Sequence, residues 1–353
     1  MLKESRHLQF KHWLSSVLSS ENTSFIDNLT PMTGDAGFRK YYRFPYNGQS
    51  LIAVDAPPLQ SNNEAFIVIQ KALTSNSLYV PQVVACDLVN GFFCITDFGN
   101  TLLSDVVSGE VKSSVIEEYY NKAIALIPTI ASTELALTES YSLPIYNQAF
   151  IHRELTIFKE WLLESHLKIE LSPPEIKQLN SCFDFLTKSA LSQPQVTVHR
   201  DFHSRNIMVL EDKELGIIDF QDAVIGPITY DIVSLLRDCY VRYPDELIKP
   251  LFESFCRLVE KKYQLDDVTP LQWQQWFDLM GLQRHLKASG IFCRLYYRDN
   301  KSGYLKDIPL TLSYIEDISA LYPQLEFLNQ LIIEKVQPLM KAMITPPLSV
   351  SEI

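Results

Sequence analysis

The sequence has 353 residues, of which 46% are hydrophobic and 21% are charged. This length suggests two domains or one domain with a large second lobe, and the composition excludes an intrinsically disordered chain. The net charge is −11, from 42 acidic and 31 basic residues. Because a nucleic-acid binder needs a basic face, the charge argues against nucleic acid as a partner.

No stretch approaches the roughly 20 apolar residues that a membrane-spanning helix needs, so we expect no association with a membrane. The first 20 residues mix charged and single apolar residues, which predicts an amphipathic helix rather than a signal peptide. None of the six cysteines forms a C-x-x-C pair, and four lie among apolar residues. This usage predicts buried, reduced thiols and a cytoplasmic protein.

Strand signals dominate the first hundred residues. Strands are expected at 24–32, 38–44, 51–54, 81–88 and 92–97, with Asn47-Gly48 as a two-residue hairpin turn. A helix ending near residue 73 is expected to open at Ser61, in a capping box with Glu64. The sequence therefore predicts about five antiparallel strands with one inserted helix.

Helical spacing dominates from residue 101 onward. Helices are expected at 112–131, 147–167, 173–191, 229–241, 245–262, 271–297 and 307–340. One β-like segment, 196–220, interrupts them. We therefore predict an α+β fold with a small antiparallel β-rich N-terminal lobe, residues 1–99, and a large, mainly helical C-terminal lobe, residues 100–353. A cleft between two lobes is a usual place for a ligand.

Polar side chains gather in the β-like segment, in the order His199-x-Asp201-x-x-x-x-Asn206 and then Asp219. Two short apolar stretches, at 207–210 and 215–218, predict a hairpin with Asn206 and Asp219 at its open end and Asp201 just before it. Phosphoryl transfer from ATP requires such a set, because an acceptor hydroxyl must be aligned and oxygen ligands must hold Mg²⁺ against the phosphates.

This arrangement resembles the catalytic loop and metal-binding aspartate of protein kinases and aminoglycoside-phosphotransferase-like small-molecule kinases. The resemblance implies a bilobal, protein-kinase-like fold. It also implies that Asp201 is the catalytic aspartate and that Asn206 and Asp219 bind magnesium. His199 would pack the loop, and Asp231 is similar to the buried aspartate that braces the catalytic loop of kinases.

Longer strings extend the resemblance over most of the chain, at 35–43, 54–58, 95–99, 219–223, 226–238 and 278–287. They are similar to one branch of that family, the bacterial anomeric N-acetylmuramate/N-acetylglucosamine kinases of peptidoglycan recycling. This resemblance implies an enzyme that uses ATP and Mg²⁺ to convert such an amino sugar to its 1-phosphate.

The sequence departs from the kinase pattern because the third strand, 51–55, carries no lysine to bind the nucleotide phosphates. Strand alternation puts Arg39 and Arg43 on one face of the preceding strand, so either is a candidate substitute, and the alternative is that both face solvent. Gly34 and Gly37 are candidates for letting backbone amides approach the phosphates, although hairpin turns also use glycine.

The adenine is expected where the lobes join, against backbone groups of Thr96, Asp97 and Phe98. The alternative is that these residues only pack a strand and form a turn.

Candidate sugar contacts are His203, Gln221, Asp222 and Glu154, each of which has an ordinary structural explanation as well. Residues 281–306 contain six basic residues and one acidic residue. This basic stretch is either a solvated helix face or, through Arg284, a site for the lactyl carboxylate of N-acetylmuramate.

Two other functions remain open from the residues alone. The first is a kinase of the same fold for another alcohol, such as an aminoglycoside, choline or ethanolamine. The basic stretch disfavours a polycationic aminoglycoside, whereas Trp273, Trp276, Tyr296 and Tyr297 leave an aromatic cage for choline possible in principle. The second is an inactive nucleotide-binding protein, which the missing lysine permits and the Asp201, Asn206 and Asp219 set opposes.

Overall fold

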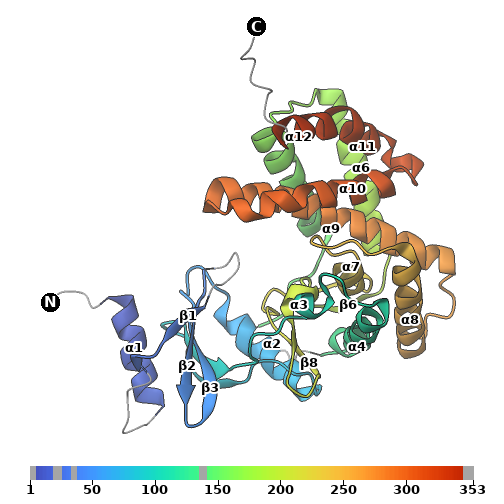
Figure 1. The fold of residues 1–353 in the computed structure, drawn as a ribbon. Coiled ribbons are helices and arrows are strands. Elements are labelled where there is room, and N and C mark those ends of the chain that lie inside the picture. Colours follow the sequence, from blue (N-terminus) through green and yellow to red (C-terminus); the bar gives the residue numbers. More distant parts are fainter. Residues whose placement is uncertain (1–4, 19–25, 33–37, 135–140, 345–353) are drawn as a thin grey trace. The chain divides into compact units, whose positions relative to one another are not determined.

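The computed structural model describes residues 5–18, 26–32, 38–134 and 141–344. The chain divides into two compact units, which are coloured along the sequence in Figure 1. The sheet unit comprises Met1–Leu143 and His199–Ala223, and the helical unit comprises Pro144–Val198 and Val224–Ile353. The lobe boundary expected near residue 99 stays a prediction. No helix in the described part of the chain is long and apolar enough to cross a membrane.

A five-stranded antiparallel sheet forms the first part of the sheet unit, as the sequence predicts. Its strands are β1 (Thr30–Met32), β2 (Lys40–Tyr46), β3 (Gln49–Asp55), β4 (Val83–Asp87) and β5 (Phe92–Thr96). They lie in the order β1-β2-β3-β5-β4. The expected turn between β2 and β3 is confirmed: Asn47 and Gly48 have φ angles of 50° and 77°, and Tyr46 pairs with Gln49. Two successive positive φ angles match the right-handed twist of the paired strands.

One helix covers each face of this sheet (Figure 1). Helix α1 (Arg6–Val17) packs Phe10 and Leu14 into one apolar cluster, and the Arg6 guanidinium lies 2.6 Å from the Asp55 carboxylate. Helix α2 (Asn63–Ser75) packs Phe66 into the cluster on the opposite face.

The expected capping box at the start of α2 is wrong, because a different residue caps the helix. The Asn62 side chain accepts a hydrogen bond from the Ala65 amide, at 3.2 Å, so the helix begins one residue later than a Ser61 cap requires. Glu64 then lies in the first turn, where a negative charge favours the helix dipole.

The predicted hairpin belongs to the sheet unit although about one hundred residues separate it from β5. Its strands are β7 (Ile207–Val209) and β8 (Leu215–Ile217), and helices α3 (Leu103–Val107) and α4 (Ser113–Ala131) complete the unit. The Ile217 amide donates to the Tyr79 carbonyl and the Val209 amide donates to the Thr101 carbonyl, each at 2.8 Å. One strand of the hairpin is therefore bonded to the segment before β4, and the other to the segment after β5.

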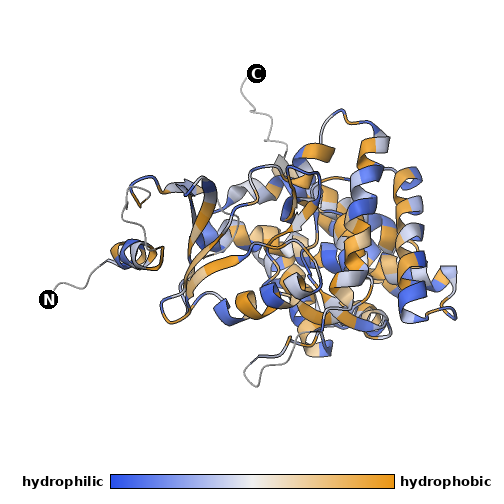
Figure 2. Ribbon diagram, turned by 90° about the horizontal axis from the view of Figure 1, so that it is seen from below, coloured by the Kyte–Doolittle hydropathy of each residue, from blue (hydrophilic) through white to orange (hydrophobic). Residues whose placement is uncertain are grey.

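The helical unit is built around one long helix, α9 (Pro270–Asp299), which contacts most of its neighbours. The other elements are α5 (Gln148–Ile157), a π-helical continuation (Phe158–His166), α6 (Pro173–Leu191), β6 (Gln195–Val198), β9 (Val224–Pro227), α7 (Tyr230–Leu236), α8 (Asp245–Tyr263), α10 (Ile308–Ser319), α11 (Glu326–Leu331) and α12 (Gln337–Ile344). Figure 2 shows hydrophobic residues along these helices and along the strands of the sheet, with hydrophilic residues in many connecting loops.

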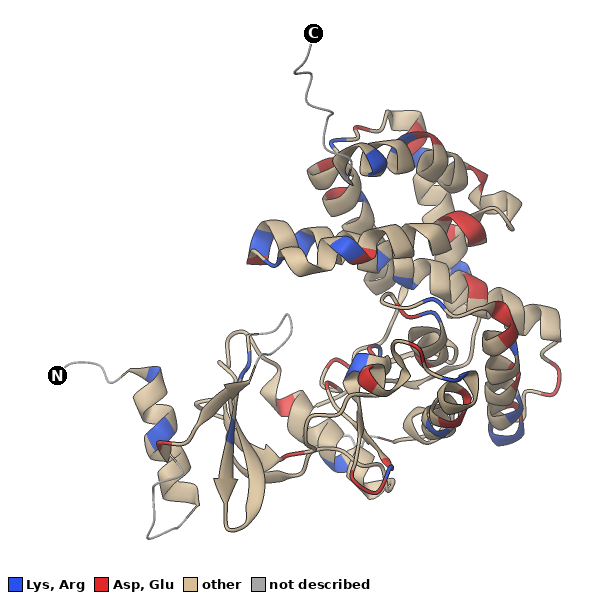
Figure 3. Cartoon of the chain, viewed as in Figure 1, with Lys and Arg blue, Asp and Glu red and all other residues tan. Residues whose placement is uncertain are grey.

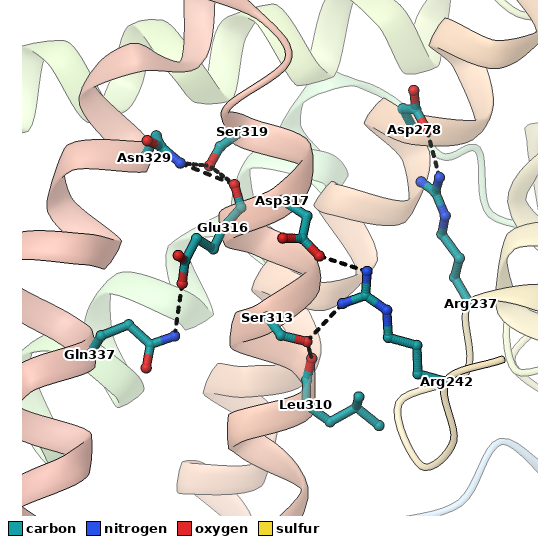
Figure 4. Close-up of polar contacts among 10 residues, drawn as sticks. All are labelled: Arg237, Arg242, Asp278, Leu310, Ser313, Glu316, Asp317, Ser319, Asn329 and Gln337. Carbon is teal, nitrogen blue, oxygen red and sulfur yellow. Dashed lines mark hydrogen bonds and ion pairs between the residues drawn. The ribbon is translucent and has the colours of Figure 1, made fainter. Parts of the chain in front are cut away.

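Two predicted helices of this unit are too long. The helix expected over 307–340 breaks after Ser319, because Pro323 opens a new turn and a proline disfavours the helical conformation of the residue before it. The helix expected over 229–241 ends at Leu236. The segment that follows is fixed by side chains instead: Arg237 pairs with Asp278 on α9 and Arg242 pairs with Asp317 on α10, each at 2.6 Å (Figure 4).

Candidate active site

The loop between β6 and β7 carries the first part of the predicted site. The His203 amide donates to the Asp201 carbonyl at 3.0 Å, and the Asn206 amide donates to the His203 carbonyl at 2.9 Å. The side chain of Asn206 is buried, and its Nδ2 donates to the Asp201 carbonyl at 3.0 Å. Asn206 therefore holds the loop in a tight turn that keeps Asp201 next to the start of the hairpin.

His199 connects this loop to the second strand of the hairpin. Its buried ring accepts a hydrogen bond from the Asp201 amide at Nδ1, at 3.3 Å, and Nε2 lies 3.0 Å from the Ile218 carbonyl. Because Nδ1 is the acceptor, Nε2 carries the proton that is donated to Ile218. The Ile218 amide in turn donates to the Asn206 carbonyl, at 3.1 Å. These bonds bring the residue before Asp219 against the loop that carries Asp201 and Asn206.

The backbone is strained at two positions in this loop and hairpin. Arg200 has a φ of 76° and Asp219 a φ of 64°, in the left-handed region that costs a non-glycine residue free energy. Arg200 is fixed there partly by a 3.1 Å hydrogen bond from its Nη1 to the Asp222 carbonyl. The surrounding bonds thus maintain an unusual direction of the chain just before Asp201 and at Asp219 itself.

The carboxylate of Asp219 feels the charges of several neighbouring side chains. Its side chain is open at the surface, yet enough protein surrounds it that desolvation raises its pKa, and the charges of Asp201 and Asp222 raise it further. A 2.6 Å hydrogen bond from Gln221 Nε2 to Oδ1 and the charge of Arg39 oppose this rise. Two carboxylates close enough to repel each other favour a bound cation.

The donor set fits Mg²⁺, which prefers oxygen ligands and keeps several positions for water or phosphate. Among the described residues, none donates a hydrogen bond to Asn206 Oδ1 or to Asp219 Oδ2. No group of three or more histidine, cysteine, aspartate or glutamate side chains that suits a metal occurs in the described part of the chain. An ion at Asn206 and Asp219 would therefore complete its coordination with oxygens from outside the protein.

The two candidate arginines have different surroundings. Arg39 and Arg43 are four residues apart, about 13 Å along an extended chain, so their side chains start from different places on the sheet. Arg43 lies beside Asp97, with its Nη2 2.8 Å from Asp97 Oδ1, whereas the charge of Arg39 acts on Asp219. Arg39 also lines a small cavity on the α2 side of the sheet with Tyr41 and Phe66.

Asp97 and Thr96, two of the residues expected to meet the adenine, form hydrogen bonds through their side chains. Desolvation raises the pKa of the Asp97 carboxyl, but hydrogen bonds from Arg43, Ser50 and the Gly99 amide outweigh it, so the pKa is lowered. Thr96 Oγ1 accepts from the Gln82 amide at 2.8 Å. The Thr96 amide also donates to the Gln82 carbonyl, at 2.9 Å. These bonds fix the chain at this point, and an adenine contact by its backbone stays a prediction.

Phe98, which follows β5, contacts the hairpin formed by β7 and β8. A Cβ added to Gly216 on β8 would lie 2.6 Å from the Phe98 ring, so the ring rests directly on the backbone of that strand. Only glycine permits this approach, because real Cβ atoms do not come so close to other heavy atoms. The Phe98 ring thereby separates the chain at residue 98 from strand β8 by the thickness of one ring contact.

The remaining loop candidates lie beside the site. Gln221 uses its amide nitrogen on Asp219, and the Asp222 side chain is exposed. His203 Nε2 lies 3.5 Å from Asn206 Nδ2. A sugar contact by any of the three stays a prediction. Gly34 and Gly37 lie outside the described residues.

Glu154, in the helical unit, is saturated by internal partners. Its buried carboxylate accepts from Tyr146 Oη at 2.6 Å and Gln283 Nε2 at 3.1 Å, and it pairs with Lys287 Nζ at 2.8 Å. These three bonds favour the structural explanation of Glu154 over a sugar contact.

The basic stretch on α9 is partly neutralised within the unit. Lys287 pairs with Glu154, and Arg298 pairs with Asp299 at 2.8 Å. Figure 3 shows basic residues along α9, including its carboxyl end. Arg284 is buried, with its guanidinium 5.5 Å from the centre of the Tyr230 ring. Asp231 is buried in the first turn of α7, and its bracing role stays a prediction.

Sequence reasoning missed one residue of the sheet unit that contacts both Arg39 and the segment after the hairpin. Phe66 lies beneath Arg39 and stacks against Phe220, the residue after Asp219. An aromatic residue on an amphipathic helix is normally assigned to the core, so the sequence alone offered no signal for a second role.

The chain combines a five-stranded antiparallel sheet and one inserted helix with a loop that carries Asp201 and a hairpin that precedes Asp219. This combination is that of a kinase-like phosphotransferase. The fold is that of solved small-molecule kinases. The choline kinase LicA from Streptococcus pneumoniae superposes with a TM-score of 0.59 at 13% identity, covering 89% of this chain and 98% of that one. The ADP-bound aminoglycoside phosphotransferase APH(2'')-Ib gives 0.57 at 13% identity, covering 88% and 98%.

Residues 28–265 match the model of the phosphotransferase enzyme family, and the chain belongs to that family. Among its relatives is the N-acetylmuramate/N-acetylglucosamine kinase of Neisseria meningitidis, 35% identical over 94% of this chain and 96% of the relative. The protein of the same name from Pseudomonas aeruginosa is 33% identical over 94% and 97%. The expected fold class and family are therefore confirmed.

Proposed function

We propose that this protein transfers the γ-phosphoryl group of ATP to the anomeric hydroxyl of N-acetylmuramate or N-acetylglucosamine, giving the sugar 1-phosphate and ADP. The relatives named for this activity match nearly the whole chain, which supports the same substrate class here. One observation carries the proposal: hydrogen bonds connect the loop that carries Asp201 to Asn206 and to Ile218, the residue before Asp219.

In the proposed reaction the anomeric oxygen attacks the γ-phosphorus while the bond from that phosphorus to the β–γ bridging oxygen breaks. The electron pair of that bond leaves with ADP, and the proton of the hydroxyl passes to the Asp201 carboxylate. Positioning and charge neutralisation supply most of the acceleration in this chemistry. The strained backbone at Arg200 serves this end, because it fixes the direction in which the Asp201 loop starts.

Asn206 and Asp219 would hold the magnesium ion that accompanies ATP. The ion would neutralise charge on the phosphates when bound. Gln221 supports this role, because its amide holds Oδ1 of Asp219 and so directs the other oxygen toward the ligand.

Arg39 is our choice for the cation that replaces the missing lysine. Its charge acts on Asp219, whereas Arg43 is bound to Asp97 at the hinge. Backbone groups of Thr96, Asp97 and Phe98 would meet the adenine. Glycines 34 and 37 would serve the phosphates through their amides.

The sugar would contact His203, Gln221 and Asp222, and Arg284 would bind the lactyl carboxylate of N-acetylmuramate. We keep Arg284 from the basic stretch because Lys287 already pairs with Glu154. We place the enzyme in the cytoplasm, a reducing compartment that suits six free thiols, five of them buried.

The test is ADP release with four acceptors in parallel: N-acetylmuramate, N-acetylglucosamine, choline and kanamycin. We expect turnover only with the two sugars, and a product whose phosphorus couples to the anomeric carbon in NMR spectra. The methyl glycoside of N-acetylglucosamine is the matched control, because it has no free anomeric hydroxyl and should not react. Turnover of that glycoside, or of choline or kanamycin in preference to the sugars, would contradict the proposal, as would no turnover with any acceptor.

A further inference from the structure

Arg39 is anchored to helix α2 without an acidic partner. Its Nη2 donates to the Asn62 carbonyl at 3.1 Å, and its guanidinium carbon lies 5.5 Å from the centre of the Phe66 ring. Both contacts lie at the amino end of α2, which begins at Asn63. No carboxylate pairs with Arg39 in the part of the chain that the structure describes.

Phe66 in turn contacts the hairpin that carries Asp219. Its ring stacks against Phe220 with centroids 5.1 Å apart and an angle of 22° between the planes. Phe220 is buried and directly follows Asp219 in the chain. We call Phe66 and Phe220 the aromatic bridge, since together they connect Arg39 to the proposed metal ligand Asp219, which directly precedes Phe220.

We infer that the aromatic bridge replaces the lysine–glutamate ion pair by which a kinase fixes its phosphate-binding cation. In this inference, which rests on the proposed function, Arg39 binds the distal phosphates of ATP. Phe66 is a positioning residue that aligns Arg39 with Asp219. A ring face attracts a guanidinium without neutralising it, so the full charge of Arg39 remains for the anionic nucleotide.

The opposite face of the same sheet shows what a purely structural arginine looks like. The Arg6 guanidinium lies 4.7 Å from the centre of the Phe92 ring, closer than Arg39 to Phe66. Arg6 is also neutralised by the carboxylate of Asp55 at 2.6 Å. Each face therefore has one arginine over an aromatic ring, and of these two, in the described part of the chain, only the Arg6 guanidinium is paired with a carboxylate.

This contrast gives a matched experiment on the full-length protein. ADP and AMP affinities are measured by titration calorimetry for Arg39→Gln, Phe66→Leu and the double variant, with melting temperatures for each. We expect Arg39→Gln to weaken ADP binding about tenfold and Phe66→Leu about threefold to fivefold, because the ring contact is a weaker interaction than the charge. The double variant should bind ADP no more than about twofold worse than Arg39→Gln, since Phe66 acts through Arg39.

Three comparisons separate positioning from packing. AMP, which lacks the distal phosphates, should keep its affinity in all three variants. Phe66→Tyr, which keeps the ring, should restore ADP affinity. Phe92→Leu should lower the melting temperature and leave ADP affinity within about twofold of the wild type.

An unchanged ADP affinity in folded Phe66→Leu overturns the inference, and so does full additivity in the double variant. Equal losses for ADP and AMP also overturn it, because they indicate a general change of the nucleotide site. The proposed function fails separately, if the wild-type protein binds ADP as described here but phosphorylates neither sugar.

Discussion

Removing the ammonium group of Lys287 breaks an ion pair with the buried carboxylate of Glu154. Glu154 is only 5% exposed, and the side chain of Lys287 is 14% exposed. In Lys287→Met the carboxylate keeps the hydrogen bonds from Tyr146 and Gln283 but loses its ion pair with Lys287. Breaking a buried pair from one side costs about 3–5 kcal/mol, and the residual exposure of Lys287 favours the lower end, about 3 kcal/mol.

The helical unit has about 185 residues, so each kcal/mol lowers its melting temperature by about 2–4 °C. We therefore expect Lys287→Met to melt about 6–12 °C below the wild type by calorimetry. Glu154→Gln combined with Lys287→Met removes both charges and should recover most of this loss. Arg298→Met is the matched control, because the Arg298–Asp299 pair is more exposed, at 50% and 21% for the two side chains, and should contribute less than about 1 kcal/mol.

A melting temperature for Lys287→Met within about 2 °C of the wild type would refute this reasoning. So would a double variant less stable than Lys287→Met alone. Either result would mean that the Glu154–Lys287 pair contributes little to stability despite its burial.

Three further outcomes are expected. Asp219→Ala should abolish Mg²⁺-dependent binding of ATP in calorimetry, and nucleotide affinity that still responds to Mg²⁺ would contradict the metal role. Gly290→Ala should destabilise the helical unit by about 3 kcal/mol or more, because the new Cβ would lie 2.4 Å from the backbone oxygen of Ile157 on α5; a thermal melt with no loss would contradict that packing. Burial raises the pKa of Cys94, Cys256 and Cys293 to about 12, so the unfolded chain ionises first and stability should fall as the pH rises from about 9 to 12. Denaturation midpoints that stay constant over that range would show that these thiols ionise in the folded state.

Local features of the site were readable from the sequence. The spacing from His199 to Asn206 and the apolar stretches of the hairpin predict one turn and one pair of strands, and local hydrogen bonds then determine the geometry. The helix Pro173–Leu191 was also predicted with its bounds from its helical spacing, and the structure shows a capping box of Ser172 and Glu175 at its start.

Contacts between distant segments were not readable. Arg39 and Phe66 come from a strand and a helix whose pairing depends on the whole sheet, and Glu154 and Lys287 are 133 positions apart. Periodicity reports which face of an element is apolar, but it does not report which cation meets which ring or carboxylate. The proposal of Arg39 rather than Arg43 therefore rests on contacts that the sequence does not report.

Element ends were uncertain for a related reason. The helix after Thr229 stops at Leu236 where the pattern continues to 241, and Arg237 and Arg242 then form ion pairs with α9 and α10. Tertiary contacts override the local preference at such ends.

The turnover number of Asp201→Asn with ATP and N-acetylmuramate tests the central claim most directly. The substitution keeps the size of the side chain and its hydrogen-bonding oxygen but removes the base that receives the proton. We predict a loss of two or more orders of magnitude in kcat, with melting temperature and ADP affinity near those of the wild type. Near-normal turnover in a folded Asp201→Asn protein would contradict the account.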